Sequence, residues 1–199
     1  MRIFVTGGSG VLGRSLLPLL AAEGHDARAP ARDELDLFDP ERVAEAVRDA
    51  EAVYHLATRI PAPERRGDPG AWRENDRLRA EASKLLVDAA LAGETRIYIQ
   101  PSVTFSADLP SALAAEQETA RFAAAGRIGV VLRLGTLDGP GTEYALPKPG
   151  PDETLHIADA GRALLAALEA PSGVYNVVRN GERVSNAQFK QATGWRPRL

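Results

Sequence analysis

Short apolar runs alternate with longer amphipathic segments along the chain. The apolar runs, rich in β-branched residues, predict buried strands at 2–6, 26–30, 52–57, 96–101, 128–134 and 173–178. The amphipathic segments predict helices after Asp39-Pro40 and at 11–23, 71–92, 110–125, 158–169 and 185–193. Because strands and helices alternate strictly, we expect an α/β fold, a doubly wound parallel sheet with helices on both faces.

Turn-forming residues mark where these elements begin and end. Asp39 followed by Pro40 predicts a helix start, because an Asp side chain caps the first N–H groups and proline fits the first helical position. Residues 58–70 hold three prolines and two glycines and are expected to form a loop, as is the Gly/Pro-rich segment 135–153.

Ligands of doubly wound parallel sheets bind at the carboxyl ends of the strands, near the point where the strand order reverses.

Composition narrows the class of protein. A chain of 199 residues with 44% hydrophobic and 26% charged residues is typical of one soluble globular domain. The absence of cysteine excludes a disulfide framework, a thiolate metal site and a cysteine nucleophile. The net charge of −3 indicates no nucleic-acid partner, and no apolar run approaches the ~20 residues of a membrane helix. The opening MRIFVTGG goes directly into a strand pattern, so we expect no signal peptide and a cytoplasmic protein.

Arginine is unusually frequent among the cations. It supplies 21 of the 24 Lys and Arg residues, which together with frequent alanine indicates GC-rich codon usage and a bacterial source. A cluster of arginines follows the third predicted strand, at Arg59, Arg65, Arg66, Arg73, Arg77 and Arg79. These side chains could meet an acidic substrate, but the interleaved Glu64, Glu74, Asp76 and Glu81 favour a solvated helix face.

A glycine-rich loop joins the first strand to the first helix. Gly7, Gly10 and Gly13 are spaced three apart, and with Gly8 the segment also satisfies G-x-G-x-x-G. One glycine makes the tight turn, one lets the backbone approach a pyrophosphate, and one lets helix pack on strand. The phosphates then lie on the N-terminus of the helix. The position of the loop at the start of a strand–helix–strand series predicts a dinucleotide site.

Several segments together resemble the extended short-chain dehydrogenase/reductase superfamily, and more narrowly its NAD-dependent epimerase/dehydratase type. The matching segments are TGGSGVLG (6–13), LDLFDPERVAEAV (35–47), VYHLAT (53–58), LRLGTLDGPG (132–141), LHIADAGRALLAAL (155–168), GVYNVV (173–178) and TGWRPRL (193–199). The resemblance covers nearly the whole chain and implies a Rossmann fold. It implies cofactor contacts from Gly7, Gly10, Val11, Leu12, Gly13, Arg14, Asp36, Leu37, Leu56, Ala57 and Thr58.

The end of the second strand bears on the choice of nicotinamide cofactor. NAD sites usually place an Asp or Glu there to hold the ribose 2′-OH. Here the position falls near Ala31 and Arg32, while Asp33 and Glu34 come too late in the chain. A guanidinium can grip a 2′-phosphate with two hydrogen bonds, so Arg32 favours NADP, with NAD as the alternative. Arg14 and Arg28 would add positive charge, unless all of these are solvated surface arginines.

The acid/base residues of this superfamily are missing at their usual place. The resemblance implies a Tyr, a Lys four residues later, and a Ser or Thr on the fourth strand. Ser102 is the best match to that Ser, and Thr104 a poorer one. Aligning Ser111 and Glu116 with the family pattern puts Asp108 at the Tyr position and Ala112 at the Lys position. No Tyr or Lys occurs between Ile99 and Ala125, so a small shift of the alignment restores neither.

One Y-x-x-x-K does occur, from Tyr144 to Lys148. Pro147 and Pro149 make a regular helix there improbable, so coincidence is favoured over a catalytic role at the substrate side. Compared with the family the chain is short. We expect one NAD(P)-binding domain over 1–199, with 135–153 as a shortened substrate-side loop and 154–199 as a reduced C-terminal segment. The pocket would then be shallow and open, or completed by a partner subunit.

These features predict an NADP-dependent oxidoreductase or epimerase acting on a small carbonyl or sugar-like metabolite, with Ser102, water or the substrate handling the proton. Two alternatives stay open: an inactive dinucleotide-binding sensor or scaffold, and a non-redox cyclase or isomerase on the same fold. His25, His55 and His156 are dispersed, so no metal site is expected. Helices 71–92 and 110–125 resemble those that form the family's dimer, which makes a homodimer an expectation by analogy.

Overall fold

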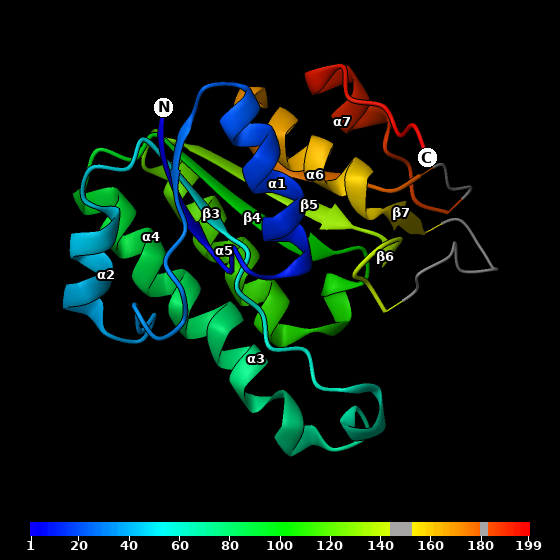
Figure 1. Ribbon diagram of the computed structural model, residues 1–199, viewed down its shortest axis with the longest axis horizontal. Coiled ribbons are helices and arrows are strands. Elements are labelled where there is room, and N and C mark those ends of the chain that lie inside the picture. The colour runs from blue at the N-terminus through cyan, green and yellow to red at the C-terminus, as the bar shows by residue number, and fades with distance from the viewer. Residues whose placement is uncertain (144–152, 180–182) are drawn as a thin grey trace.

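A six-stranded, fully parallel sheet forms the centre of the molecule. The structure is a computed structural model, and it describes residues 1–143, 153–179 and 183–199. The strand order is β2-β1-β3-β4-β5-β8 (Figure 1). The strands are β1 (Arg2–Thr6), β2 (Asp26–Arg28), β3 (Ala52–His55), β4 (Ile97–Val103), β5 (Ile128–Leu134) and β8 (Gly173–Val177). The order reverses between β1 and β3, where a doubly wound sheet places its ligand. The α/β fold expected from the sequence is confirmed.

Helices cover both faces of the sheet (Figure 1). One face carries α1 (Val11–Ala22), α6 (Ile157–Ala166) and α7 (Ala187–Thr193), and the other carries α2 (Pro40–Val47), α4 (Ser83–Ala92) and α5 (Pro110–Ala124). Each layer has its own apolar core, one around Leu16 and Leu164 and the other around Val43, Leu86 and Phe122. The predicted start of α2 is confirmed, because Asp39 Oδ1 accepts hydrogen bonds from the N–H groups of Glu41 and Arg42, both at 3.1 Å.

The predicted helix 71–92 differs most from the structure. It is divided into a 3-10 turn (Pro69–Trp72), α3 (Arg73–Arg77), a π-helical turn (Leu78–Ala82) and α4. A π turn departs from the usual i→i+4 hydrogen-bond pattern and often lies at a functional site. Here the Leu78 carbonyl at its start accepts a hydrogen bond from the buried ring of His55 at 2.9 Å. A contact from a distant strand of this kind has no signature in the local sequence.

Other boundaries shift by a few residues. The predicted strands 26–30 and 52–57 end at Arg28 and His55, whereas the predicted strand 96–101 covers 97–103. The β2 strand lies at the edge of the sheet and pairs with β1 over Asp26–Arg28. The predicted helix 158–169 becomes α6 followed by a 3-10 turn, Ala167–Glu169, and the last helix starts at Ala187. Short 3-10 turns also occur at Pro63–Arg65, within the predicted loop 58–70, and at Ser106–Asp108.

A small second sheet was not predicted. The segment 135–153, expected to be a loop, contains β6 (Thr136–Asp138), which pairs in parallel with β7 (Thr154–His156). Three residues are too few to show the alternating pattern that identifies a strand. Gly135 lies close to the Glu153 carbonyl at the other end of this segment. A Cβ on residue 135 would clash with that oxygen, so the close approach requires glycine.

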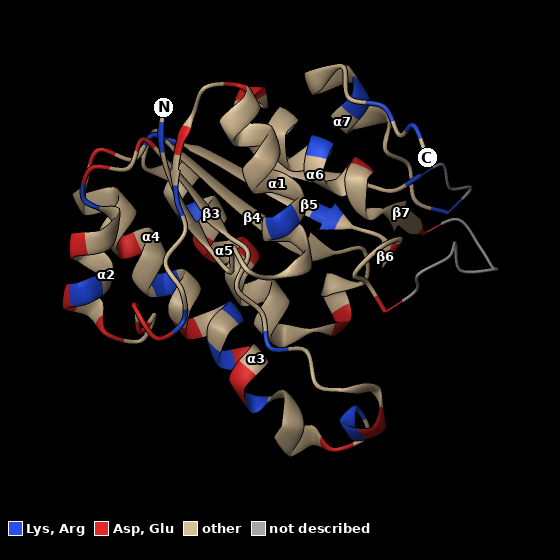
Figure 2. Cartoon of the chain, in the orientation of Figure 1, with Lys and Arg blue, Asp and Glu red and all other residues tan. Residues whose placement is uncertain are grey.

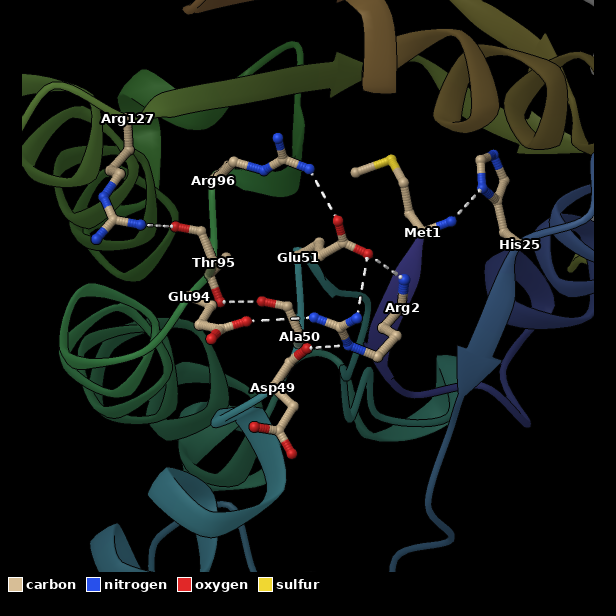
Figure 3. Close-up of polar contacts among 10 residues, drawn as sticks. All are labelled: Met1, Arg2, His25, Asp49, Ala50, Glu51, Glu94, Thr95, Arg96 and Arg127. Atoms are coloured by element: carbon tan, nitrogen blue, oxygen red, sulfur yellow. Dashed lines mark hydrogen bonds and ion pairs between the residues drawn. The ribbon is translucent and has the colours of Figure 1, made fainter.

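Charged residues fasten the starts of the strands to one another (Figure 3). The Glu51 carboxylate accepts a hydrogen bond from the Arg2 backbone at 2.9 Å and forms an ion pair with Arg96 at 2.8 Å. Arg2 also forms an ion pair with Glu94 at 3.2 Å. The segments that lead into β1, β3 and β4, far apart in the sequence, are therefore linked to one another. The hydrogen bond from Arg2 lowers the pKa of Glu51. These contacts lie at the amino ends of the strands, whereas the glycine loop follows the carboxyl end of β1, and they are structural.

A buried carboxylate on α6 helps to hold the C-terminal tail. Asp159, on α6, is fully buried and accepts hydrogen bonds from the backbone N–H groups of Arg198 and Leu199, both at 3.0 Å. It also forms an ion pair with Arg162. The indole of Trp195 donates to the Asp159 carbonyl at 3.2 Å. The tail is therefore packed against the same face of the sheet as α1 and α6.

Candidate functional site

The glycine loop connects the end of β1 to the start of α1. Gly7 has a φ of +71°, and its carbonyl accepts a hydrogen bond from Gly10 N–H at 3.0 Å, which closes the turn. Gly10 is the N-cap of α1 and brings no side chain to it. The first N–H groups of a helix have no partner within the helix and carry partial positive charge. An anion placed at Gly10 would therefore meet both free donors and a favourable dipole.

The three predicted glycines have different steric surroundings. A Cβ on Gly7 would lie 2.7 Å from the Ala57 nitrogen, and one on Gly13 would clash with the Gly8 carbonyl oxygen. Both positions therefore require glycine for the loop to pack on β3 and α1. A Cβ on Gly10 would meet only the Gly7 carbonyl oxygen, at 3.2 Å. Gly10 is thus the position where the backbone is left open to the outside of the loop.

A chain of buried hydrogen bonds joins β1, β3 and the π turn beneath this loop. The Thr6 hydroxyl lies 2.7 Å from His55 Nδ1, and His55 Nε2 lies 2.9 Å from the Leu78 carbonyl. Since a carbonyl can only accept, Nε2 carries the proton and the Thr6 hydroxyl donates to Nδ1. Thr6 Oγ1 in turn accepts from the Ala57 N–H at 3.2 Å. Burial lowers the pKa of His55 to about 4, against an opposing contribution from the Leu78 carbonyl.

This histidine predicts a loss of stability in weak acid. The pKa is about 4 in the folded protein and ordinarily near 6.5, so the unfolded chain binds more protons between these values. The free energy of unfolding should fall by about 2 kcal/mol between pH 7 and pH 5, and level off below pH 4. His55→Gln should remove this part of the pH dependence, measured by urea unfolding at several pH values. The control His25→Gln should keep it, and an equal slope in His55→Gln would contradict the assignment.

A cleft of about 980 Å³ opens beside the loop, at the carboxyl ends of β1, β2 and β3. Of the residues predicted to contact a cofactor, eight line it: Gly7, Gly10, Arg32, Asp36, Leu37, Leu56, Ala57 and Thr58. The other four, Val11, Leu12, Gly13 and Arg14, do not. Val11 and Leu12 pack partly on the core, and Arg14 donates to the Ser9 carbonyl at 2.5 Å. The structure therefore brings most of the predicted cofactor residues together.

One end of the cleft is lined by the segment after β2. The Asp36 side chain accepts a hydrogen bond from the Phe38 N–H at 2.9 Å, which fixes the turn of the chain there. The Arg77 guanidinium lies 4.0 Å from the centre of the Phe38 ring, a favourable cation–π contact. Arg77 is held in turn by Glu81, with Nε and Oε2 3.0 Å apart. Leu35, Leu37 and Phe38 make this end of the cleft partly apolar.

The arginine cluster borders the cleft and is also solvated, as the interleaved acids predicted. The Arg59, Arg65 and Arg77 side chains are 62%, 68% and 46% exposed, and each pairs with a nearby carboxylate. Charged residues alternate along α3 and the loop before it (Figure 2). Four of the six arginines line the cleft: Arg59, Arg65, Arg73 and Arg77. Arg66 instead forms an ion pair with Glu143 at 2.6 Å. The position of this segment in the sequence indicates that it borders the cleft, because it directly follows β3, a strand that lies next to the glycine loop.

Ser102 lies in a buried ionic network on the other side of the sheet. Its hydroxyl donates to Glu116 at 2.6 Å, and Arg133 contacts the same carboxylate through two nitrogens, at 3.0 and 2.6 Å. Burial raises the pKa of Glu116, but hydrogen bonds from Arg133 and Ser102 outweigh it, so the pKa lies below its usual value. Ser102 is 8% exposed and does not line the cleft. A role for it in proton transfer stays a prediction.

The remaining candidates do not form a further site within the described ranges. Tyr144 and Lys148 lie outside the described residues. Thr104 donates to Glu153 at 3.3 Å, and His156 caps α6 by accepting from the Ala158 N–H at 3.2 Å. In the part of the chain that is described, no three His, Asp or Glu side chains gather as metal ligands. No helix among residues 1–143, 153–179 and 183–199 is long and apolar enough to span a membrane.

Known proteins share both the sequence pattern and the fold. The family model described as RmlD substrate binding domain matches residues 1–120. A protein of Streptomyces sp. named 3-diazoavenalumate denitrifying reductase is 33% identical over 241 residues, covering 95% of this chain and 79% of that protein. The aligned length exceeds the 199 residues of this chain, so the relative carries residues that this chain lacks.

Solved structures with a similar fold include proteins in complex with NADPH or NAD. RMD from Pseudomonas aeruginosa, complexed with NADPH, has a TM-score of 0.78 at 22% identity, covering 100% of this chain and 95% of that chain. UDP-glucose 4-epimerase from Thermus thermophilus, in complex with NAD, has a TM-score of 0.77 at 20% identity, covering 100% and 94%. At these identities the likeness shows the fold alone.

Proposed function

The chain belongs to the RmlD substrate binding domain family, within the extended short-chain dehydrogenase/reductases, and from this premise we propose that it is a reductase that binds a nicotinamide dinucleotide in its cleft. The observation that carries the proposal is the open backbone at Gly10, where a pyrophosphate would replace a side chain. The free N–H groups of α1 would hold the phosphates, and the turn at Asp36 and Phe38 would hold the adenine.

NADPH is the dinucleotide that the charge of the cleft favours. Arg32 lines the cleft after β2, where a ribose 2′-phosphate would lie. Four further arginines line the same cleft and make it more attractive to a dianionic phosphate than to a hydroxyl: Arg59, Arg65, Arg73 and Arg77. Similar structures contain NADPH in one case and NAD in another, so the preference for NADPH is argued from the residues of this chain.

The missing Tyr and Lys bear on the substrate. The dinucleotide, when bound, supplies a hydride. A carbonyl that accepts a hydride also needs a proton on its oxygen, and residues 100–124 contain no Tyr or Lys to give it. A carbon-bound diazonium group needs none: a C–H bond forms, the C–N bond breaks with its electron pair on nitrogen, and N2 leaves. The relative named as a denitrifying reductase of a diazo compound supports this class of substrate.

We therefore propose reductive loss of N2 from an aryl diazonium or related diazo compound as the reaction. The test follows NADPH oxidation and N2 release with an aryl diazonium salt, and NADPH oxidation with a panel of aldehydes, ketones and sugar nucleotides. We expect turnover of the diazonium salt at least about 100-fold faster than of any carbonyl, because a proton donor contributes about that factor or more to carbonyl reduction.

Diazonium salts can also react with NADPH without a catalyst. The rate measured with the Gly10→Val variant, in which the proposed phosphate site is blocked, gives this background and is subtracted. Equal or faster turnover of a carbonyl substrate would contradict the proposal and require a proton donor elsewhere in the chain. Tight NADPH binding with no turnover on either class would favour the sensor or scaffold instead.

A further inference from the structure

An ion pair bridges the mouth of the cleft. The Glu74 carboxylate, at the start of α3, contacts the Arg32 guanidinium in the segment after β2. Its second oxygen lies 3.8 Å from Arg59 Nε, in the segment after β3. All three residues line the cleft. Glu74 thus links the segment after β2 to the segment after β3. It is the acidic group that pairs with Arg32, the arginine expected to bind the ribose 2′-phosphate.

The same guanidinium cannot satisfy both a carboxylate and a phosphate in full. Arg32 and Glu74 side chains are 70% and 40% exposed, so their ion pair is solvated and weak enough to be displaced. A phosphate monoester carries about twice the charge of a carboxylate and has three acceptor oxygens. On displacement, Glu74 can stay with Arg59, which is already within ion-pair distance. A ribose 2′-OH has no charge with which to displace it.

We propose that Glu74 is a specificity-determining residue that competes with the ribose 2′-phosphate for Arg32, and so lowers the preference of the cleft for NADPH over NADH. The inference rests on the proposed function, because it concerns the same cleft and cofactor. Glu74 acts here as an internal anion: it screens Arg32 from weaker anions and must be displaced by the 2′-phosphate. The NADPH:NADH preference is then set by the Arg32–Glu74 pair, and not by Arg32 alone.

The test measures the Kd of NADPH and NADH for wild-type protein and Glu74→Gln by calorimetry. It adds 2′,5′-ADP and 5′-ADP, which carry the adenosine end of the two cofactors without the nicotinamide. Removing the competing charge should tighten NADPH and 2′,5′-ADP by about threefold to fivefold, the upper part of the range expected for an exposed ion pair. The ratio of the NADH and NADPH Kd values should rise by at least about threefold.

Two controls separate this from a general charge effect. Glu64→Gln makes the same charge change on an exposed residue of the same segment that does not line the cleft, and should leave the ratio as in wild type. In the double variant Arg32→Ala/Glu74→Gln the gain from Glu74→Gln should vanish, because no guanidinium is left to compete for.

An unchanged or smaller NADPH preference in Glu74→Gln, with both dinucleotides still bound, would overturn the inference and leave the proposed function standing. A preference that rises equally in Glu64→Gln would also overturn it. Protein that binds neither dinucleotide, in both the wild type and Glu74→Gln, would overturn the inference and the proposed function together.

Discussion

Gly10→Val is expected to weaken the binding of NADPH and NADH at least about 100-fold while the protein stays folded. The Cβ would point into the space where a pyrophosphate would meet the N-terminus of α1, and it would meet only the Gly7 carbonyl oxygen, at 3.2 Å, within the protein. Two of the strongest expected contacts, the free N–H groups and the helix dipole, become unreachable together. Calorimetric titration with each dinucleotide measures the loss.

The matched control is Gly67→Val, the same exchange at a glycine that has nothing within 4 Å of its added Cβ and does not line the cleft. It should bind both dinucleotides as the wild type does. Circular dichroism and thermal unfolding should show that Gly10→Val keeps its fold. Unaltered NADPH binding in folded Gly10→Val would place the dinucleotide elsewhere than on this loop.

Glu116→Gln is expected to lower the free energy of unfolding by about 2 kcal/mol, less than for a fully buried ion pair, because the Arg133 side chain is 30% exposed. The Gln side chain keeps the shape but leaves Arg133, on the neighbouring strand β5, without a counter-charge. It would also turn an amide donor or a weaker acceptor toward Ser102, which now donates at 2.6 Å. For a chain of this size the melting temperature should fall by about 4–8 °C.

The control Glu118→Gln lies on the same helix but pairs with Arg121 at the surface, and it should cost less than about 1 kcal/mol. The lowered pKa of Glu116 adds a second signature. Its stabilising effect is present above its ordinary pKa of about 4.5 and is lost as the pH falls through the lower pKa of the folded state. A loss in Glu116→Gln no larger than in Glu118→Gln would contradict the view that this network is a structural support.

The sequence predicted the parts of the molecule that local chemistry determines. The glycine spacing, the Asp39-Pro40 helix start and the apolar strands each depend on residues a few positions apart, and the structure confirms them. The loop residues Gly7 and Gly13 could be predicted because each fills a steric role that no other residue fills.

The parts that were missed depend on contacts between distant segments. Arg73 lines the cleft because the fold brings α3 beside the ends of β1 and β2, which charge patterning along one helix cannot show. Glu116 could be placed by alignment with a family pattern, but its contact with Ser102 and Arg133 required three elements to be assembled. The Leu78 carbonyl, where the π turn begins, likewise accepts a hydrogen bond from a distant residue, the buried His55 on β3.

The fate of the transferred hydrogen tests the account most directly. The protein is incubated in ordinary water with an aryl diazonium salt and NADPH carrying deuterium at C4 of the nicotinamide, prepared in each of the two stereochemical forms. The account predicts release of N2 and a product with deuterium on the carbon that lost nitrogen, from one of the two forms only. A product that keeps both nitrogens, or that carries only hydrogen from solvent at that carbon, would contradict it.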